Sequence, residues 1–102
     1  MLNITLNKNT EKRLNDYVSI FKGNYNSMFN EILSYRANQL KKALRIIQSD
    51  LHYFEKKYNM TSENFYNLFE KGNLSDENSD FYQWSGEYEM FLNYKNEMKV
   101  LK

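Results

Sequence analysis

The chain contains no cysteine and no proline, only three glycines, and a single histidine, His52. Without cysteine it forms no disulfide and no thiolate metal site, and one histidine leaves no pair of imidazoles to bind a metal ion. The scarcity of glycine argues against a glycine-rich loop that cradles phosphate. We therefore expect a protein that is not an enzyme and that needs no metal or cofactor.

Long apolar runs are missing as well. No window approaches the roughly 18–20 apolar residues that a membrane-spanning helix needs, and the N-terminus lacks the basic start and apolar run of a signal peptide. At 102 residues, the chain has the length of a single domain. We expect a cytoplasmic protein.

The formal net charge of +1 hides an uneven distribution. Residues 1–57 hold ten Lys and Arg against five Asp and Glu, whereas residues 58–102 hold four Lys against eight Asp and Glu. A basic first half suits a polyanion, and an acidic second half suits a basic protein. Chance variation in a short chain is the alternative.

The N-terminal segment 2–7 is the one stretch in which apolar and polar residues alternate strictly. Such alternation predicts a half-buried strand, with Leu2, Ile4 and Leu6 on one face. A strand needs a hydrogen-bonding partner, and no second strand is predicted downstream. The same strand of a second copy is the simplest partner, which predicts a homodimer.

A short helix should follow, since apolar residues recur at helical spacing from Leu14 to Phe21. Asn9 and Thr10 are candidate caps at its start, and Gly23 suits the left-handed position after its end. Ser27 is the expected N-cap of the next helix.

That second helix is predicted to be long, because apolar residues repeat every three or four positions from residue 33 to residue 58. The repeat carries neither Gly nor Pro. Its apolar seam must be covered either by the helix of a second copy or by the C-terminal helices of the same chain, and both arrangements fit. The seam positions are Leu33, Ala37, Leu40, Leu44, Ile47, Leu51, Phe54 and Tyr58.

Two further helices are predicted, one from Thr61 to a stop at Gly72, and one that starts near Ser79 with Asp80 as its N-cap. Both are rich in aromatic residues. These side chains could form the core against the long helix, or they could bind a protein partner, and we expect both uses. The predicted partner-binding residues are Phe65, Leu68, Phe69, Phe81, Trp84, Tyr88 and Phe91.

The order strand, helix, turn, helix in residues 2–40 resembles the ribbon-helix-helix family of DNA-binding repressors and antitoxins. The resemblance is carried by the alternating segment 2–7, Arg13-Leu14, the turn 23–27, and Phe29 with Ile32-Leu33. It implies that two strands pair across a dimer and enter the major groove, and that the start of the second helix holds DNA phosphates. The implied base readers are Asn3, Thr5 and Asn7, and the implied phosphate anchors are Asn26, Ser27 and the amide of Met28.

The second half is similar to the C-terminal region of small prokaryotic antitoxin-like proteins. The similarity is carried by residues 57–60, Ser62-Glu63, Phe65, Phe69-Glu70, Gly72, Leu74, Asp76, Asp80-Phe81 and Trp84. In such antitoxins this segment wraps around and neutralises a toxin, which agrees with the acidic and aromatic character of these residues.

Together these features predict a mainly α-helical ribbon-helix-helix dimer, with one N-terminal strand per chain, an extended second helix and two further C-terminal helices. Residues 1–40 would form the DNA-binding and dimerisation unit, 41–58 a helical extension and 59–102 a partner-binding region. The predicted function is a repressor that acts as the antitoxin of a toxin–antitoxin pair and binds operator DNA and the toxin. The alternative is a dimeric helical scaffold or adaptor that does not bind nucleic acid.

Overall fold

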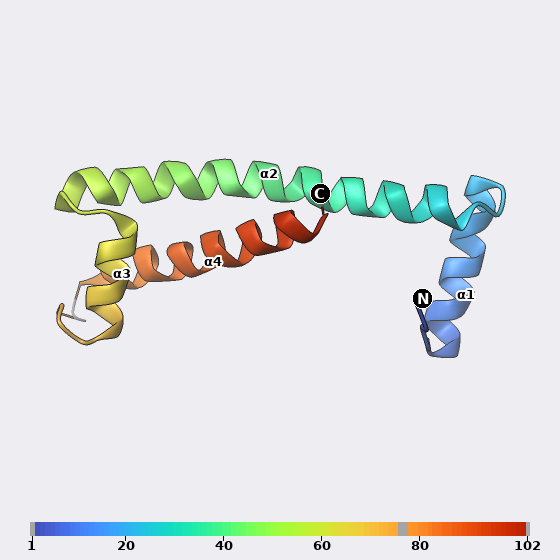
Figure 1. Cartoon of the computed structure of the whole chain (residues 1–102), viewed down its shortest axis with the longest axis horizontal. Helices are drawn as coiled ribbons and strands as arrows, with labels where there is room; N and C mark the ends of the chain where they lie inside the picture. The colour runs from blue at the N-terminus through green and yellow to red at the C-terminus, as the bar shows by residue number, and fades with distance from the viewer. Residues whose placement is uncertain (1, 76–77, 102) are drawn as a thin grey trace. The chain divides into compact units, whose positions relative to one another are not determined.

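The computed structural model describes residues 2–75 and 78–101, and its regular elements are all helical (Figure 1). In chain order they are α1 (Lys8–Val18), the short 3₁₀ helix η1 (Ser19–Phe21), α2 (Tyr25–Tyr58), α3 (Ser62–Glu70) and α4 (Ser79–Leu101). The chain divides into two compact units, Met1–Tyr35 and Arg36–Lys102, and the division falls within α2. We call them the N-terminal unit and the C-terminal unit.

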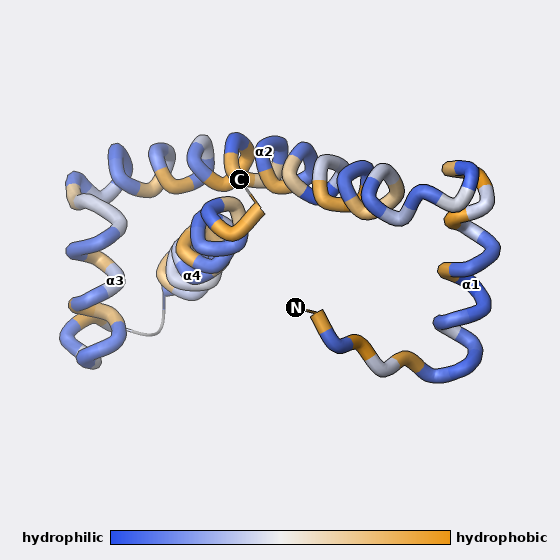
Figure 2. The backbone as a smooth tube through the Cα atoms, turned by 45° about the vertical axis from the view of Figure 1, so that its right-hand side comes forward, coloured by the Kyte–Doolittle hydropathy of each residue, from blue (hydrophilic) through white to orange (hydrophobic). Residues whose placement is uncertain are grey.

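The predicted N-terminal strand is absent, so the ribbon-helix-helix fold predicted from residues 2–40 is wrong. Residues 2–7 precede α1 without regular structure, and no strand occurs in any described residue. The alternation of apolar and polar residues is visible along this segment in Figure 2. A strand requires a ladder of hydrogen bonds to a neighbouring segment, and none of the described residues supplies one. The mainly helical class remains correct.

Local signals set the limits of α1. Asn7 is its N-cap, since Asn7 Oδ1 accepts a hydrogen bond of 2.8 Å from the amide of Thr10. After η1 the chain reverses through Lys22 and Gly23, both with positive φ, which confirms the left-handed position predicted for Gly23. Asn24 then caps α2, because its Oδ1 accepts from the amide of Ser27 at 3.1 Å. The prediction that Ser27 itself is the cap was wrong by one turn.

In the C-terminal unit, α4 runs antiparallel to α2 (Figure 1). Two ion pairs fix this register: Arg36 near one end of the contact binds Glu97, and Lys57 near the other binds Asp80. The helix α3 starts where predicted, with Thr61 as its N-cap, and ends before Gly72, the predicted stop, whose φ is 73°.

The core of this unit consists of the apolar seam of α2 and the aromatic residues of α3 and α4. Phe65 and Trp84 are fully buried, and Trp84 stacks on Phe65 with ring centroids 3.8 Å apart. The C-terminal helices of the same chain therefore cover the seam within this unit, which decides between the two arrangements left open by the sequence. The buried cluster comprises Ile47, Leu51, Phe54, Phe65 and Trp84.

The two structural units differ from the three predicted regions. Residues 41–58 and 59–102, expected as a helical extension and a partner-binding region, belong to one unit. Asp76, one of the residues that carried the C-terminal resemblance, lies outside the described residues.

Candidate functional site

The N-terminal unit has an apolar surface that its own residues leave uncovered. Of its described residues only Val18 and Met28 are buried. Ile20 remains 73% exposed and Ile4 61% exposed, although both side chains are purely apolar. The large apolar residues exposed in this unit are Leu2, Ile4, Leu6, Tyr17, Ile20, Tyr25, Phe29, Ile32, Leu33 and Tyr35. We call these ten residues the N-terminal apolar surface.

Two hollows lie in the same unit. The first, of about 610 Å³, lies between the segment before α1, α1 itself and the first turns of α2, and its lining includes Ile4, Leu6 and Phe29. The second, of about 640 Å³, is formed along α1 and η1 and includes Tyr17 and Ile20. Leu14 lines both. The unit therefore presents hollows and projecting apolar side chains together.

Aromatic contacts hold this surface in shape. Tyr17 and Phe21 meet edge to face with centroids 5.4 Å apart, and Tyr25 stacks on Phe29 at 6.3 Å. The hydroxyl of Tyr25 donates a hydrogen bond of 2.9 Å to Asn15 on α1, which ties α2 to α1. Tyr17, Tyr25 and Phe29 are thus in contact with their neighbours and still exposed.

The predicted DNA-binding residues fall into two groups. Asn3, Thr5 and Asn26 are exposed with polar side chains on the surface. The other three are engaged within the chain. Asn7 caps α1, the amide of Ser27 donates to Asn24 Oδ1, and Met28 is fully buried with its amide donating to the Asn24 carbonyl. The predicted phosphate anchors at Ser27 and Met28 therefore already have hydrogen-bond partners.

The predicted partner-binding residues lie in or around the core of the C-terminal unit. Phe65 and Trp84 have no exposed area, so they contribute to folding in this conformation. The others are partly buried, and all but Leu68 pack against the core cluster. The half-buried residues are Leu68, Phe69, Phe81, Tyr88 and Phe91.

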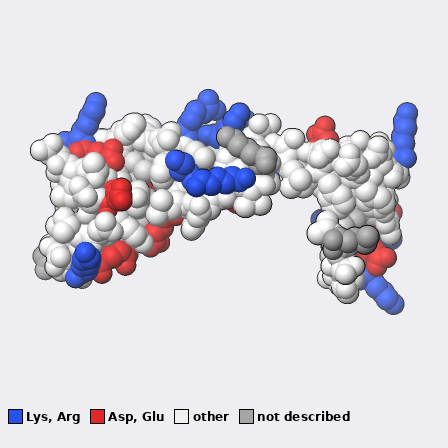
Figure 3. Space-filling model, viewed as in Figure 1, with Lys and Arg blue, Asp and Glu red and all other residues white. Residues whose placement is uncertain are grey.

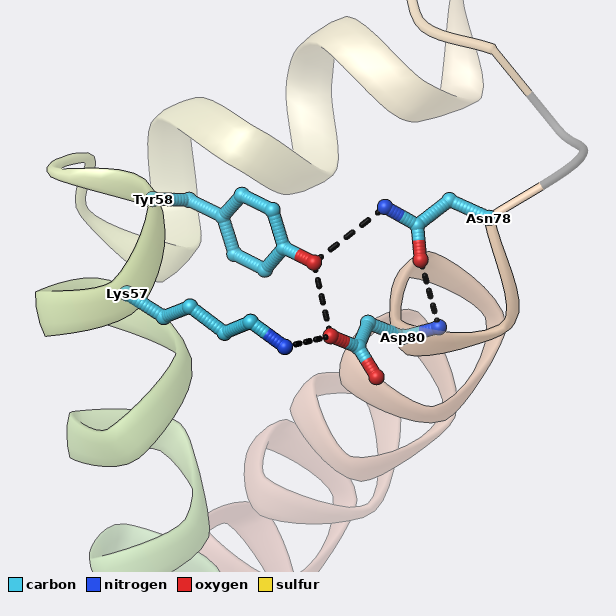
Figure 4. Close-up of polar contacts among 4 residues, drawn as sticks. All are labelled: Lys57, Tyr58, Asn78 and Asp80. Carbon is cyan, nitrogen blue, oxygen red and sulfur yellow. Dashed lines mark hydrogen bonds and ion pairs between the residues drawn. The ribbon is translucent and has the colours of Figure 1, made fainter.

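A polar network joins the end of α2 to the start of α4 (Figure 4). Asp80 Oδ2 accepts hydrogen bonds from Lys57 Nζ at 2.7 Å and from the Tyr58 hydroxyl at 2.6 Å. Asn78 donates to the Tyr58 oxygen, and its own Oδ1 accepts from the amide of Asp80. The bond from Lys57 lowers the pKa of Asp80, with a further contribution from Tyr58. The predicted N-cap role of Asp80 was wrong, since Asn78 fills that role.

The carboxyl group of Glu87 on α4 is partly buried beside that of Asp50 on α2. Its Oε2 atom is buried and has no hydrogen-bond partner there. Burial raises the pKa of Glu87 from 4.5 to about 7, and the carboxyl group of Asp50 on α2 adds to the effect. Two neighbouring carboxyl groups in partly desolvated surroundings disfavour the ionised form of Glu87.

This pair predicts a pH-dependent stability. Between pH 4.5 and about 7 the folded chain binds more protons at Glu87 than the unfolded chain, so the free energy of unfolding should fall as the pH rises through that range. Because the group is partly solvated, we expect a loss of only about 1 kcal/mol. Urea unfolding at several pH values measures it. Glu87→Gln should remove the slope, while Glu63→Gln, at an exposed position, should keep it; equal slopes in wild type and Glu87→Gln would contradict the assignment.

The two ion pairs between α2 and α4 act in a different pH range. The pKa values of Asp80 and Glu97 are lowered, chiefly by hydrogen bonds from Lys57 and Arg36 respectively. Their stabilising effect is complete above the ordinary carboxyl pKa values of 3.8 and 4.5 and is lost as the pH falls below them. The slope above pH 4.5 therefore reports on Glu87.

Catalytic and metal-binding groups were not predicted, and the described residues contain no cluster of three or more His, Cys, Asp or Glu that could hold a metal ion. None of the helices described here combines the length and apolar character needed to cross a bilayer. The candidate interaction surfaces are an apolar one on the N-terminal unit and charged ones on the C-terminal unit.

Sequence reasoning missed two features. The N-terminal apolar surface was missed because Leu2, Ile4 and Leu6 were predicted to form one face of a half-buried strand. The Asp50–Glu87 pair depends on the register between two helices that are distant in sequence, and no local pattern signals it.

Comparisons with known proteins add no family assignment. No protein-family model matches this chain, and neither a curated protein nor a solved structure matches it.

Proposed function

We propose that this chain is a homodimeric helical interaction protein, an adaptor without catalytic activity, in which the N-terminal unit joins two copies and the C-terminal unit is presented in duplicate. The observation that carries the proposal is the N-terminal apolar surface, ten large exposed side chains in a unit whose described residues include only two buried ones. Exposed apolar area concentrated in one small unit favours a protein interface.

A second copy is the occupant that the N-terminal unit itself favours. The unit has hollows lined by Leu14 and also exposed apolar side chains outside them, such as Leu2, so each copy offers both halves of a contact. A two-fold dimer places the same surface on both sides of the interface. Residues 1–35 hold four Lys and Arg against three Asp and Glu, so charge repulsion between copies is weak.

The molar mass in solution tests the proposal. Light scattering over a dilution series should give twice the mass of one chain at high concentration, with dissociation on dilution. The mass of a single chain at every concentration would contradict it.

A second candidate function is a dimeric DNA-binding repressor of the antitoxin type. Seven basic residues of the first half take part in no ion pair within the described residues: Lys8, Arg13, Lys22, Lys41, Lys42, Arg45 and Lys56. Such cations can neutralise phosphates, and the exposed Asn3 and Thr5 have side chains suited to base edges.

Gel-shift assays on DNA from the promoter of its own gene test this candidate. We expect a complex that weakens steeply as salt increases, because phosphate contacts release counterions. Asn3→Ala/Thr5→Ala should reduce the preference for that DNA over unrelated DNA, whereas Asn9→Ala, at an exposed polar position nearby, should not. No complex at low salt would remove this candidate. An unchanged preference in the double variant would remove the role of Asn3 and Thr5.

A further inference from the structure

A lysine-rimmed groove lies in the C-terminal unit, between α2 and the last turns of α4. It has a volume of about 340 Å³ and is lined by Lys41, Leu44, Lys95, Met98 and Lys99. Figure 3 shows Lys and Arg side chains gathered over the middle of α2 and the adjoining end of α4. The groove belongs to a different unit from the N-terminal apolar surface, and it does not depend on the proposed dimer.

Its positive charge is not neutralised within the described residues. Lys41, Lys95 and Lys99 are exposed and form no ion pair there. The acidic residue between the last two, Glu97, is engaged by Arg36 through two hydrogen bonds of 2.7 and 3.0 Å. The ammonium group of Lys95 lies 5.2 Å from the centre of the Phe91 ring, which holds it close to the protein surface.

The floor of the groove is apolar. Leu44 is half-buried and Met98 is only 8% exposed, so a side chain that enters would meet carbon and sulfur atoms between the ammonium groups. The methionine side chain is flexible, and methionine is common on surfaces that accept helical segments. The volume suits a small number of apolar side chains and is at the lower limit for small-molecule sites.

We propose that this groove is a docking site for an acidic amphipathic segment of a partner protein. A helix with Leu or Phe on one face and Glu or Asp beside it satisfies both the floor and the rim, in the helix-in-groove manner. A nucleic acid would use the cations and leave the apolar floor without a function. An anionic membrane surface could contact the lysines, but it presents no segment that would enter a groove between two helices.

Fluorescence anisotropy on the full chain tests the proposal with a short labelled helical peptide that has Leu on one face flanked by Glu. Two matched peptides replace Glu by Gln or Leu by Ser. We expect the Leu/Glu peptide to bind. Both matched peptides should bind at least about tenfold more weakly, a change of ~1.4 kcal/mol or more in the binding free energy.

Variants of the protein locate the site. Lys41→Glu/Lys95→Glu should weaken binding of the Leu/Glu peptide by about tenfold or more. Lys56→Glu/Lys71→Glu makes the same change of charge at exposed positions outside the groove and should bind like wild type. Thermal unfolding of both checks the fold, and Lys41→Gln/Lys99→Gln provides a milder second variant that should also bind more weakly.

Several outcomes would overturn the proposal. One is equal binding of the Glu and Gln peptides, and another is an equal loss in the two charge-reversed variants. If the peptide does not bind, but duplex DNA or phosphatidylserine vesicles do and lose affinity in Lys41→Glu/Lys95→Glu, the cations serve a different partner. Failure of the peptide to bind at all would remove the site.

Discussion

Trp84→Ala should unfold the C-terminal unit or bring it close to unfolding. The indole is fully buried and stacks on Phe65 with ring centroids 3.8 Å apart, and it also stacks on Phe54 at 5.6 Å. Truncating a buried Trp to Ala typically costs 3–5 kcal/mol, roughly as much as the whole stability of a small domain. Urea unfolding followed by far-UV circular dichroism measures the loss.

Two further variants separate packing from hydrogen bonding. The indole Nε1 donates to Ser62 Oγ at 2.8 Å, so Ser62→Ala leaves a buried N–H without a partner and should cost about 1–3 kcal/mol, less than Trp84→Ala. Tyr82, on the same helix, is 57% exposed, and Tyr82→Ala should cost well under half of what Trp84→Ala costs, because little area is uncovered. Similar losses for Trp84→Ala and Tyr82→Ala would contradict the account of this core.

Helix ends were the part of the fold that local sequence signals determined best. Thr61 stands at the predicted start of α3, Gly72 follows its predicted end, and Gly23 takes the positive φ predicted for it. These features depend on a few adjacent residues and on the conformational freedom of glycine, so they can be predicted without knowing the tertiary structure.

The prediction of an N-terminal strand was wrong because the alternation of apolar and polar residues is typical of a half-buried strand but does not provide a hydrogen-bonding partner. A second signal in the same residues pointed elsewhere. Asn7 lies three residues before Thr10 and four before Glu11, the spacing of a helix start, and the structure uses it in that way. Asn7, one of the three residues predicted to read bases, therefore caps α1 instead.

The heptad repeat predicted a long amphipathic helix correctly, but the sequence left open what covers it. The answer depends on α3 and α4 folding back, which requires the break at Asn59, where φ is 52°, and the contact between Lys57 and Asp80. Leu33, the first seam position, lies in the N-terminal unit and stays 47% exposed. The aromatic residues were ambiguous for the same reason, because burial of Phe65 and Trp84 is decided by long-range packing.

Ile4→Asp/Ile20→Asp should convert the proposed dimer into monomers. Each isoleucine lines a different hollow of the N-terminal unit, and both are largely exposed in the single chain, so the substitutions should leave the fold of the chain intact. In a dimer they would place carboxylates in an apolar contact. Each substitution occurs in both copies of the dimer, so losing ~2 kcal/mol of burial at each of four positions corresponds to a dissociation constant raised by more than about 100,000-fold.

Ile46→Asp/Tyr53→Asp is the matched control. Both residues are exposed to a similar extent, at 65% and 59%, and they lie on α2 in the C-terminal unit, outside the N-terminal apolar surface. The change in charge is the same, so a general effect of added carboxylates would appear in this variant too. Circular dichroism of the three proteins should show the same helix content.

Light scattering of wild type, Ile4→Asp/Ile20→Asp and Ile46→Asp/Tyr53→Asp at matched concentrations tests the central claim most directly. The account predicts twice the chain mass for wild type and for the Ile46/Tyr53 variant, and the mass of one chain for the Ile4/Ile20 variant. A wild-type chain that is monomeric throughout, or an Ile4/Ile20 variant that remains a dimer, would contradict the claim that the N-terminal apolar surface joins two copies.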